Sequence, residues 1–403
     1  MPANRPAPPE PRLTVTRPTR GRLRRALAVA LPLPVVGLVL LMASGHLLLP
    51  LQKVVTIEAK MASKRDFFED PEVERLLLKH GFRVRITRMG SREIANQDIK
   101  GYDVVFPSGQ PAADLITRER AAADRPVTTY RPFVSPIVLA TYREYAEALR
   151  GNGVARLQRG SGGQSLYYTL DMEKFLALTR GGKTWDGIGI ARYGVDNGNK
   201  VLAQSSDICE SNSGGTYLGL VAFVEHENDA PDTLPEAERL ARDIKPLLVE
   251  QGLPSAEKAE TYLSADGKGI SPIAVIYEHQ FLAHQIAYEA EHGTPDSERV
   301  LLYPSTRIDT EPQLVALTRD GDRLGELITS DLELQHRAME LGFRVRDTRS
   351  DATSVQLKEF LGERDIPAPV TSADDTKAVL PRLPLLERMI QIVGDCPPAE
   401  GAE

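Results

Sequence analysis

The sequence predicts an α/β fold in which a largely parallel β-sheet is covered by helices on both faces. Short extended runs, alternating or fully apolar, are separated by segments with helical periodicity. The extended runs end at turns that contain Ser or Gly, and no fixed-period repeat is apparent. Strands that alternate with helices form parallel sheets, because each crossover helix returns the chain to the same end of the sheet. With 403 residues, the chain is long enough for about two to three domains and a large core.

The N-terminal half of the predicted fold runs strand, helix, strand, helix, strand. These elements are expected at residues 53–60, 68–81, 82–90, 91–99 and 102–109. The first helix has the clearest boundaries: Asp70 suits the N-cap, Pro71 suits the first turn, and Gly81 suits the end.

The C-terminal half begins with a longer extended run at residues 133–142, which Pro136 interrupts. The pattern then predicts a helix at 170–182, a strand at 199–207, a helix at 215–226, a strand and a helix within 271–289, a strand at 299–305, two helices within 322–344 and a last helix at 383–394.

The N-terminus differs sharply in charge from the rest of the chain. Residues 1–25 hold seven arginines and one glutamate, a formal charge of +6, whereas the whole chain carries −7. Because the remainder is acidic, nucleic acid is excluded as the main partner of the folded part. The Pro- and Arg-rich composition of this tail is typical of disorder.

Residues 26–49 predict a transmembrane anchor. They form a mostly apolar run of 24 residues without a charged side chain, about 36 Å long as a helix. Four arginines, from Arg20 to Arg25, directly precede the run, so we expect residues 1–25 in the cytoplasm and the large domain outside the cell. A signal peptide cleaved near Ala43 and a buried core helix are the alternatives.

The two cysteines, Cys209 and Cys396, would lie in an oxidising space if the domain is exported. We predict that they form one disulfide, with a pair of free thiols as the alternative. No cysteine follows the apolar run at a position that suits lipid attachment.

Four turns at the predicted strand ends carry serine. In parallel sheets, ligands bind beyond the carboxyl ends of the strands. The turns read KMASKRD, RMGSRE, PSGQP and SDICESNSGG, and they contribute Ser63, Ser91, Ser108 and the group Ser211, Asn212, Ser213 and Gly214. Together they predict a shared ligand cleft, although Ser and Gly are also ordinary turn residues.

The turn from Ser211 to Gly214 allows more than one interpretation. A serine there suits the N-cap of the following helix, whose N–H groups attract an anion or a polar group, and the open backbone at Gly214 lets a ligand approach. Alternatively, Ser213 is the nucleophile of a serine hydrolase, although Ser211 replaces the first glycine of that motif.

Other chemistry is sparse. Glu278 and His279 end an apolar run and either face the cleft or only begin the next helix. Cations near the loops favour an anionic ligand: Lys60, Lys64, Arg65, Arg88 and Arg92. The chain has no dinucleotide-binding loop, P-loop or metal-ligand spacing, so we expect no cofactor and no metal site.

Several segments in their order resemble bacterial extracellular solute-binding proteins with the type 2 periplasmic-binding-protein fold, and most closely their membrane-anchored actinobacterial forms. The segments are GYDVVFPSGQPAA, RPFVSPIVLATY, GKTWDGIGI, SSDICESNSGGTYLGLVAFV, PIAVIYEHQFLA and GDRLGELITSDLELQHRAMELGFR.

This resemblance implies two lobes with a ligand cleft between them. It assigns residues 53–140 and 297–395 to the first lobe and residues 141–296 to the second. It also implies a non-enzymatic protein that captures a small polar or anionic molecule for transport or sensing, with a permease or sensor as partner. A ligand-free interaction scaffold is a further alternative. The predicted anchor at residues 26–49 is a difference from diffusible binding proteins, which have none.

Overall fold

The computed structural model describes residues 54–125, 127–158, 165–249, 258–264, 266–308, 310–345, 353–370 and 376–396. The chain divides into two units, Met1–Lys53 and Val54–Glu403, and all described residues belong to the second. The predicted tail at residues 1–25 and the predicted anchor at residues 26–49 therefore lie outside the described residues. From Val54 onward, no described helix has the length and apolar character needed to cross a membrane.

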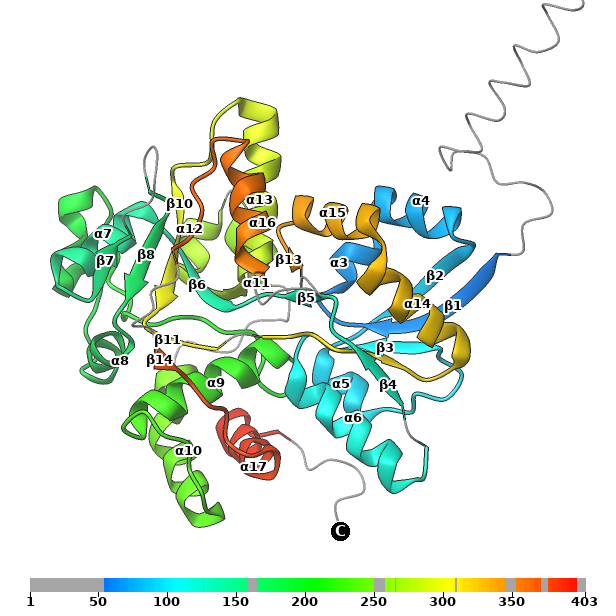
Figure 1. Ribbon diagram of the computed structural model, residues 1–403. Helices are drawn as coiled ribbons and strands as arrows, with labels where there is room; N and C mark the ends of the chain where they lie inside the picture. Colours follow the sequence, from blue (N-terminus) through cyan, green and yellow to red (C-terminus); the bar gives the residue numbers. More distant parts are fainter. Residues whose placement is uncertain are drawn as a thin grey trace, which may run out of the picture. The chain divides into compact units, whose positions relative to one another are not determined.

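The first of two large sheets has the strand order β2-β1-β3-β12-β4 (Figure 1). Its strands are β1 (Val55–Met61), β2 (Phe82–Arg88), β3 (Val104–Phe106), β4 (Thr128–Tyr130) and β12 (Leu314–Ala316). β1 pairs in parallel with β2 and β3, as the alternation of strands and helices predicted. β12 enters from a distant part of the chain and runs antiparallel to β3 and β4, so the sheet is mixed rather than wholly parallel.

Helices cover both faces of this sheet. They are α3 (Arg65–Phe68), α4 (Pro71–Lys79), α14 (Arg319–Ser330) and α15 (Leu332–Glu340) with one core cluster, and α5 (Ser91–Asn96) and α6 (Gln110–Ala122) with another. Alternation along β1 sends Ile57 and Ala59 into the first cluster, whereas Val105 of β3 packs in the second. The Asp70 carboxylate caps α4 by accepting from the N–H groups of Glu72 and Val73, which confirms the predicted helix start.

The second sheet has the strand order β7-β8-β10-β6-β9 and is also mixed. Its strands are β6 (Ile137–Tyr142), β7 (Ala155–Leu157), β8 (Tyr167–Leu170), β9 (Ile273–Tyr277) and β10 (Arg299–Pro304). The helices of this part are α7 (Arg143–Gly151), α8 (Met172–Arg180), α9 (Asn212–Glu225), α10 (Leu234–Val249), α11 (Lys258–Leu263), α12 (Gly267–Ile270) and α13 (Glu278–His292), with short 3-10 turns at Asp186–Ile188 and Ile190–Tyr193.

The predicted strand at residues 199–207 is wrong. Only single bridges form there, from Lys200 to Thr184 and from Gln204 to Ala274, and the rest of the segment is irregular. Its apolar residues Val201 and Ala203 are buried in the core, so their burial comes from packing and not from membership of a sheet.

Two extended segments connect the sheets side by side. The first contains β5 (Phe133–Val134) and leads into β6, and the second contains β11 (Thr306–Arg307) and leads from β10 to β12. The N–H of Ser135 in the first donates to the carbonyl of Thr310 in the second at 3.0 Å. β5 also pairs with β13 (Arg344–Val345), and β11 pairs with β14 (Thr376–Lys377).

The last two helices, α16 (Thr353–Gly362) and α17 (Leu383–Gly394), pack in the hydrophobic core of the second sheet. α17 lies against α10 and α9 (Figure 1). The residue ranges that we assigned to the two lobes stay a prediction, but the packing of α17 favours placing it with the second sheet.

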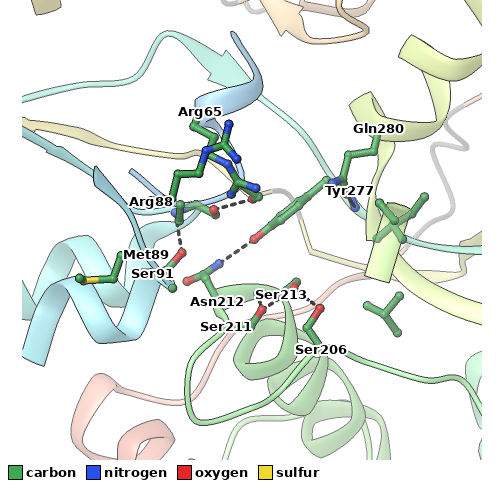
Figure 2. Close-up of a pocket in the computed structure, with 17 residues that line it drawn as sticks. Arg65, Arg88, Met89, Ser91, Ser206, Ser211, Asn212, Ser213, Tyr277 and Gln280 are labelled. Carbon is green, nitrogen blue, oxygen red and sulfur yellow. Dashed lines mark hydrogen bonds between the residues drawn. The ribbon is translucent and has the colours of Figure 1, made fainter. Parts of the chain in front are cut away.

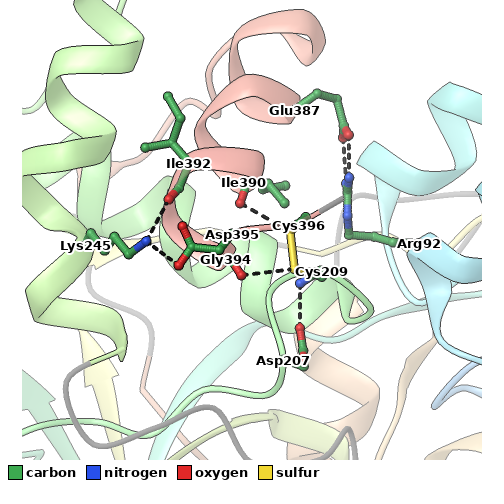
Figure 3. Close-up of a disulfide and its surroundings, with 10 residues drawn as sticks. All are labelled: Arg92, Asp207, Cys209, Lys245, Glu387, Ile390, Ile392, Gly394, Asp395 and Cys396. Atoms are coloured by element: carbon green, nitrogen blue, oxygen red, sulfur yellow. Dashed lines mark hydrogen bonds and ion pairs between the residues drawn. A yellow bond between two sulfur atoms is a disulfide. The ribbon is translucent and has the colours of Figure 1, made fainter. Parts of the chain in front are cut away.

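A disulfide joins Cys209 to Cys396, as predicted, with their Cα atoms 5.5 Å apart (Figure 3). It fastens the end of α17 to the loop that precedes α9. Lys245 of α10 supports the same end of α17 by donating to the carbonyl of Ile392 at 3.1 Å and to the carboxylate of Asp395 at 2.6 Å.

We expect reduction of this disulfide to lower the free energy of unfolding by about 2–5 kcal/mol, because the bond restricts the unfolded chain over a sequence separation of 187 residues. Urea unfolding of the full chain with and without reductant measures the effect. The variant with Cys209→Ser and Cys396→Ser serves as the control and should match the reduced protein. Equal unfolding midpoints in all three samples would contradict the expectation.

Candidate functional site

A cavity of about 240 Å³ lies where turns from both sheets meet (Figure 2). From the first sheet, Ser63, Ser91 and Ser108 reach it from the turns after β1, β2 and β3. These three strands are parallel, so their carboxyl ends lie at the same edge. From the second sheet come Ser206, Ser211, Asn212, Ser213, Val275, Ile276, Tyr277 and Gln280.

The serines of the first sheet are connected to one another. The hydroxyls of Ser63 and Ser108 are 2.6 Å apart, and the N–H of Ser108 donates to the hydroxyl of Ser91 at 2.9 Å. Ser91 and Ser108 are buried, so this network orients their hydroxyls within the wall of the cavity.

The start of α9 forms the opposite wall. Ser211 is its N-cap, and its hydroxyl accepts from the N–H groups of Ser213 at 3.1 Å and Gly214 at 3.4 Å. The helix begins at Asn212, three residues before the predicted start at Gly215. The capping hydroxyl lies 2.6 Å from that of Ser213, which in turn lies 3.5 Å from that of Ser206.

This arrangement does not favour the hydrolase alternative. A serine nucleophile requires a hydrogen-bonded base. The hydroxyl of Ser213 instead bonds to the hydroxyls of Ser206 and Ser211, and no imidazole or carboxylate within the described residues bonds to it.

Asn212 and Tyr277 both line the cavity and contact each other. The Asn212 amide donates to the Tyr277 hydroxyl at 3.2 Å and to the Thr216 hydroxyl at the same distance. Burial raises the pKa of Tyr277, so its phenol stays protonated at neutral pH. Figure 2 shows the contact between the Asn212 amide and the Tyr277 hydroxyl as a dashed line.

The charge of the wall is positive. Arg65 and Arg88 line the cavity, and no Asp or Glu does so in the described part of the chain. Glu69 pairs with both guanidiniums, at 3.7 Å from Arg65 and 2.8 Å from Arg88, which holds them at the rim. The helices α9 and α13 also begin at the cavity, and their N-termini add partial positive charge.

The other cations near the loops have structural partners. Lys60 donates to the carbonyl of Asp98 at 2.8 Å. Arg92 makes a two-pronged ion pair with Glu387 of α17, with one contact at 2.6 Å (Figure 3).

Two of the predicted ligand residues do not line the cavity. A Cβ atom on Gly214 would lie 2.6 Å from the carbonyl oxygen of Ser206, so this position needs glycine for the packing of the preceding loop. Glu278 is fully buried and binds Arg344 at 2.5 and 2.6 Å and the Tyr303 hydroxyl at 2.6 Å. Its carboxylate therefore holds together segments that are distant in sequence.

The two sheets approach closely at glycines. A Cβ atom on Gly90 would lie 2.7 Å from the carbonyl oxygen of Glu210, and one on Gly109 would lie 2.0 Å from the amide nitrogen of Asn212. Next to the first contact, the N–H of Arg92 donates to the carbonyl of Glu210 at 3.1 Å. The distance across the cavity thus depends on close contact of these two glycines with the Glu210 backbone and the Asn212 side chain.

Lys64 lies beside the cavity and is fully buried. Its ammonium nitrogen lies 3.3 Å from the centre of the Tyr277 ring and 3.4 Å from Nδ1 of His279. Burial lowers the pKa of Lys64 far below that of an ordinary lysine, an effect that the nearby Asp66 only partly opposes.

Ser206, Tyr277 and Gln280 were missing from the predicted site. The sequence contains a partial signal for Tyr277 and Gln280, because both follow the apolar run that forms β9 at the start of a helix. Ser206 was assigned to a strand, and only the tertiary packing of the loop brings it to the cavity.

No described group of three or more His, Cys, Asp or Glu side chains is placed to hold a metal ion. The wall therefore consists of hydroxyls, an amide, a phenol and two guanidiniums, which suit the binding of a polar anion.

The fold is that of known periplasmic solute-binding proteins. Iron-bound HitA from Pseudomonas aeruginosa is 14% identical, with a TM-score of 0.50 over 84% of this chain and 99% of that chain. The substrate-binding protein of an ABC transporter from Agrobacterium tumefaciens is 11% identical, with a TM-score of 0.51 over 86% and 95%. The sulfate-binding protein SubI from Mycobacterium tuberculosis is 14% identical, with a lower TM-score of 0.43 over 80% and 94%.

No protein-family model matches the sequence, and no curated protein matches it either. The structural likeness at these identities confirms the two-lobed fold and does not extend to the ligand or to the membrane-anchored form.

We expect Gly90→Ala to lower the free energy of unfolding by about 1–3 kcal/mol, because the new methyl group must displace the backbone at Glu210. Chemical denaturation of the full chain measures the loss. Gly362→Ala is the matched control, since a Cβ atom there meets nothing within 4 Å. Equal stability of the two variants would contradict the close approach at Gly90.

We expect Lys64→Met to raise the free energy of unfolding at pH 7 by about 1–4 kcal/mol, because it removes a buried amine that must either carry a poorly solvated charge or release its proton on folding. The unfolded chain keeps the Lys64 proton up to about pH 10.4, whereas the folded protein releases it at lower pH. Stability of the wild type therefore rises with pH in the window below 10.4, and the advantage of the variant shrinks there.

Denaturation at several pH values between 7 and 10 tests this expectation. The exposed Lys174→Met serves as control and should leave the pH dependence unchanged. Parallel pH profiles for the wild type and Lys64→Met would show that Lys64 titrates normally.

Proposed function

We propose that this chain is a solute-binding protein that captures a small anionic molecule in the cavity between its two sheets. The composition of the wall carries this proposal: six serines and two arginines line the cavity, and no carboxylate lines it within the described residues. Serine hydroxyls donate hydrogen bonds to any oxyanion, and guanidiniums add charge and directed N–H groups.

The position of these groups strengthens the argument. Most of the serines are buried, so water competes poorly for their hydroxyls and the local dielectric constant is low. The helices α9 and α13 begin beside the same cavity. An anion that enters the cavity exchanges its hydrating water molecules for hydrogen-bond donors that are already oriented. This limits the entropy cost of binding.

The fold supports a role in uptake or sensing. The substrate-binding protein of the ABC transporter from Agrobacterium tumefaciens shares this fold. We propose that the large domain acts outside the cell, held by residues 26–49, and delivers its ligand to a permease or a sensor partner. A protein that binds and releases without chemistry also agrees with the Ser213 hydroxyl, whose side-chain partners among the described residues are the hydroxyls of Ser206 and Ser211.

We expect phosphate or sulfate to stabilise the full chain against heat, whereas neutral sugars leave it unchanged. An anion at 100 times its dissociation constant should add about 2.7 kcal/mol to the free energy of unfolding. Arg88→Gln should weaken anion binding about three- to tenfold, because a charged donor at the partly exposed rim is lost. Thermal scans and titration calorimetry measure both effects.

Arg85→Gln is the matched control for this test. Arg85 lies on the same strand as Arg88, is similarly exposed and pairs with Glu58 at 2.5 Å, but it does not line the cavity. Equal losses in the two variants, or stabilisation by sugars and not by anions, would reject an anion site in this cavity.

A further inference from the structure

A second cavity of about 190 Å³ continues from the first. The two share four residues of their walls, which are Ser63, Arg65, Ala259 and Gln280. The rest of the second wall consists of Asp66, Glu260, Leu263, His279, Ala283, Leu341 and Phe343. A bare inorganic anion among the serines of the first cavity leaves this adjoining space without a ligand group.

His279 lines the second cavity, and its side chain carries an unsatisfied polar atom. Its side chain is only 2% exposed and stacks on Phe343 with ring centres 4.0 Å apart. Nδ1 of the ring has two partners, the Ser135 hydroxyl at 2.8 Å and the Lys64 ammonium nitrogen at 3.4 Å. Nε2 is buried and has no hydrogen-bond partner among the described residues.

The partners of Nδ1 identify the role of Nε2. Lys64 has N–H groups to donate, and the Ser135 oxygen already accepts from the N–H of His279 at 3.3 Å, so its own hydrogen is directed to Nδ1. Nδ1 is therefore an acceptor. Burial, with the nearby charge of Lys64, lowers the pKa of His279 and keeps the ring neutral. The single ring proton then lies on Nε2, which donates.

The rim of the second cavity offers the opposite chemistry. Asp66 and Glu260 line the cavity and are exposed, and a carboxylate is able to accept hydrogen bonds from a ligand. A ligand group that both accepts from the imidazole N–H and donates to a carboxylate satisfies both ends, and a hydroxyl does this. An ammonium group has no lone pair for Nε2–H, so it satisfies only the rim.

We propose that the second cavity is a subsite for the hydroxyl-bearing tail of a phosphate monoester whose phosphate lies among the serines of the first cavity. This proposal rests on the anion-binding function proposed above and narrows its ligand to phosphorylated polyols. Arg65 and Ser63 line both cavities and therefore meet the ester where head and tail join.

The charge of the first cavity favours a phosphate ester over a sulfate ester. A phosphate monoester carries about −1.5 to −2 at pH 7, whereas a sulfate ester carries a single charge. The two arginines at the rim and the two helix N-termini match the larger charge, even with Glu69 paired to the arginines.

The test compares two ligands that differ only in hydroxyls. Titration calorimetry of the full chain with glycerol 3-phosphate and with n-propyl phosphate measures how much the hydroxyls of the tail contribute to affinity. Inorganic phosphate measures the affinity of the phosphate group alone. We expect glycerol 3-phosphate to bind about three- to tenfold more tightly than n-propyl phosphate, the gain of about one hydrogen bond at a buried donor. Phosphoethanolamine tests a cationic tail and should bind more weakly than glycerol 3-phosphate.

Two variants test whether the tighter binding of glycerol 3-phosphate arises in the second cavity. His279→Asn keeps an acceptor for Ser135 and removes Nε2–H, so the preference for glycerol 3-phosphate should fall to about one while n-propyl phosphate binds as before. Ala283→Leu, at a partly exposed position of α13, fills the cavity from a second side and should abolish the same preference. His292→Asn, exposed on the same helix, is the control and should leave the preference intact.

Different outcomes reject different parts of the proposal. If inorganic phosphate binds but glycerol 3-phosphate has no advantage over n-propyl phosphate, the subsite is wrong and the anion site stands. Tighter binding of phosphoethanolamine than of glycerol 3-phosphate also overturns the hydroxyl subsite, in favour of a cationic tail. If none of the phosphate probes binds, both the subsite and the phosphate site are rejected.

Discussion

The candidate site depends on backbone contact between the loop before α9 and the turns that end β2 and β3. Gly90 and Gly109 lie so close to Glu210 and Asn212 that a side-chain carbon at either position would overlap its neighbour. The hydrogen bond from the N–H of Arg92 to the carbonyl of Glu210 fixes the same contact. Because Gly90 and Gly109 have no side chain, the walls meet closely there, and serines from one sheet face serines from the other across a small cavity.

The C-terminal helix secures this contact from behind. α17 is tied to the loop by the disulfide at Cys209 and to the first sheet by the ion pair between Glu387 and Arg92. The loop is irregular and receives no support from a continuous β ladder. The disulfide and the ion pair therefore hold this loop in place of sheet hydrogen bonds. The same loop contributes Ser206 and Ser211 to the wall of the cavity.

Several polar groups around the cavity are buried. Their burial costs free energy that an apolar core of the same shape would not. The serines bond to one another, but Lys64 is fully buried beside the Tyr277 ring, and Nε2 of His279 has no partner among the described residues. A buried donor without a partner costs about 1–3 kcal/mol, so a bound group that accepts from it regains that energy. Departures of this kind from good packing concentrate at functional sites.

The sequence by itself determined the strands β1 to β3, the helices α4 and α5 between them and the position of serine at each strand end, because local periodicity and turn chemistry act over a few residues. It also indicated the disulfide, since two cysteines permit one intramolecular bond. Only the tertiary structure decided that the segment containing Ser206 is a loop, that Gly214 serves packing, and that Glu278 binds Arg344 instead of facing the cavity. These outcomes depend on contacts between residues that are distant in the chain, and local pattern carries no information about which distant backbone or charge a residue will meet.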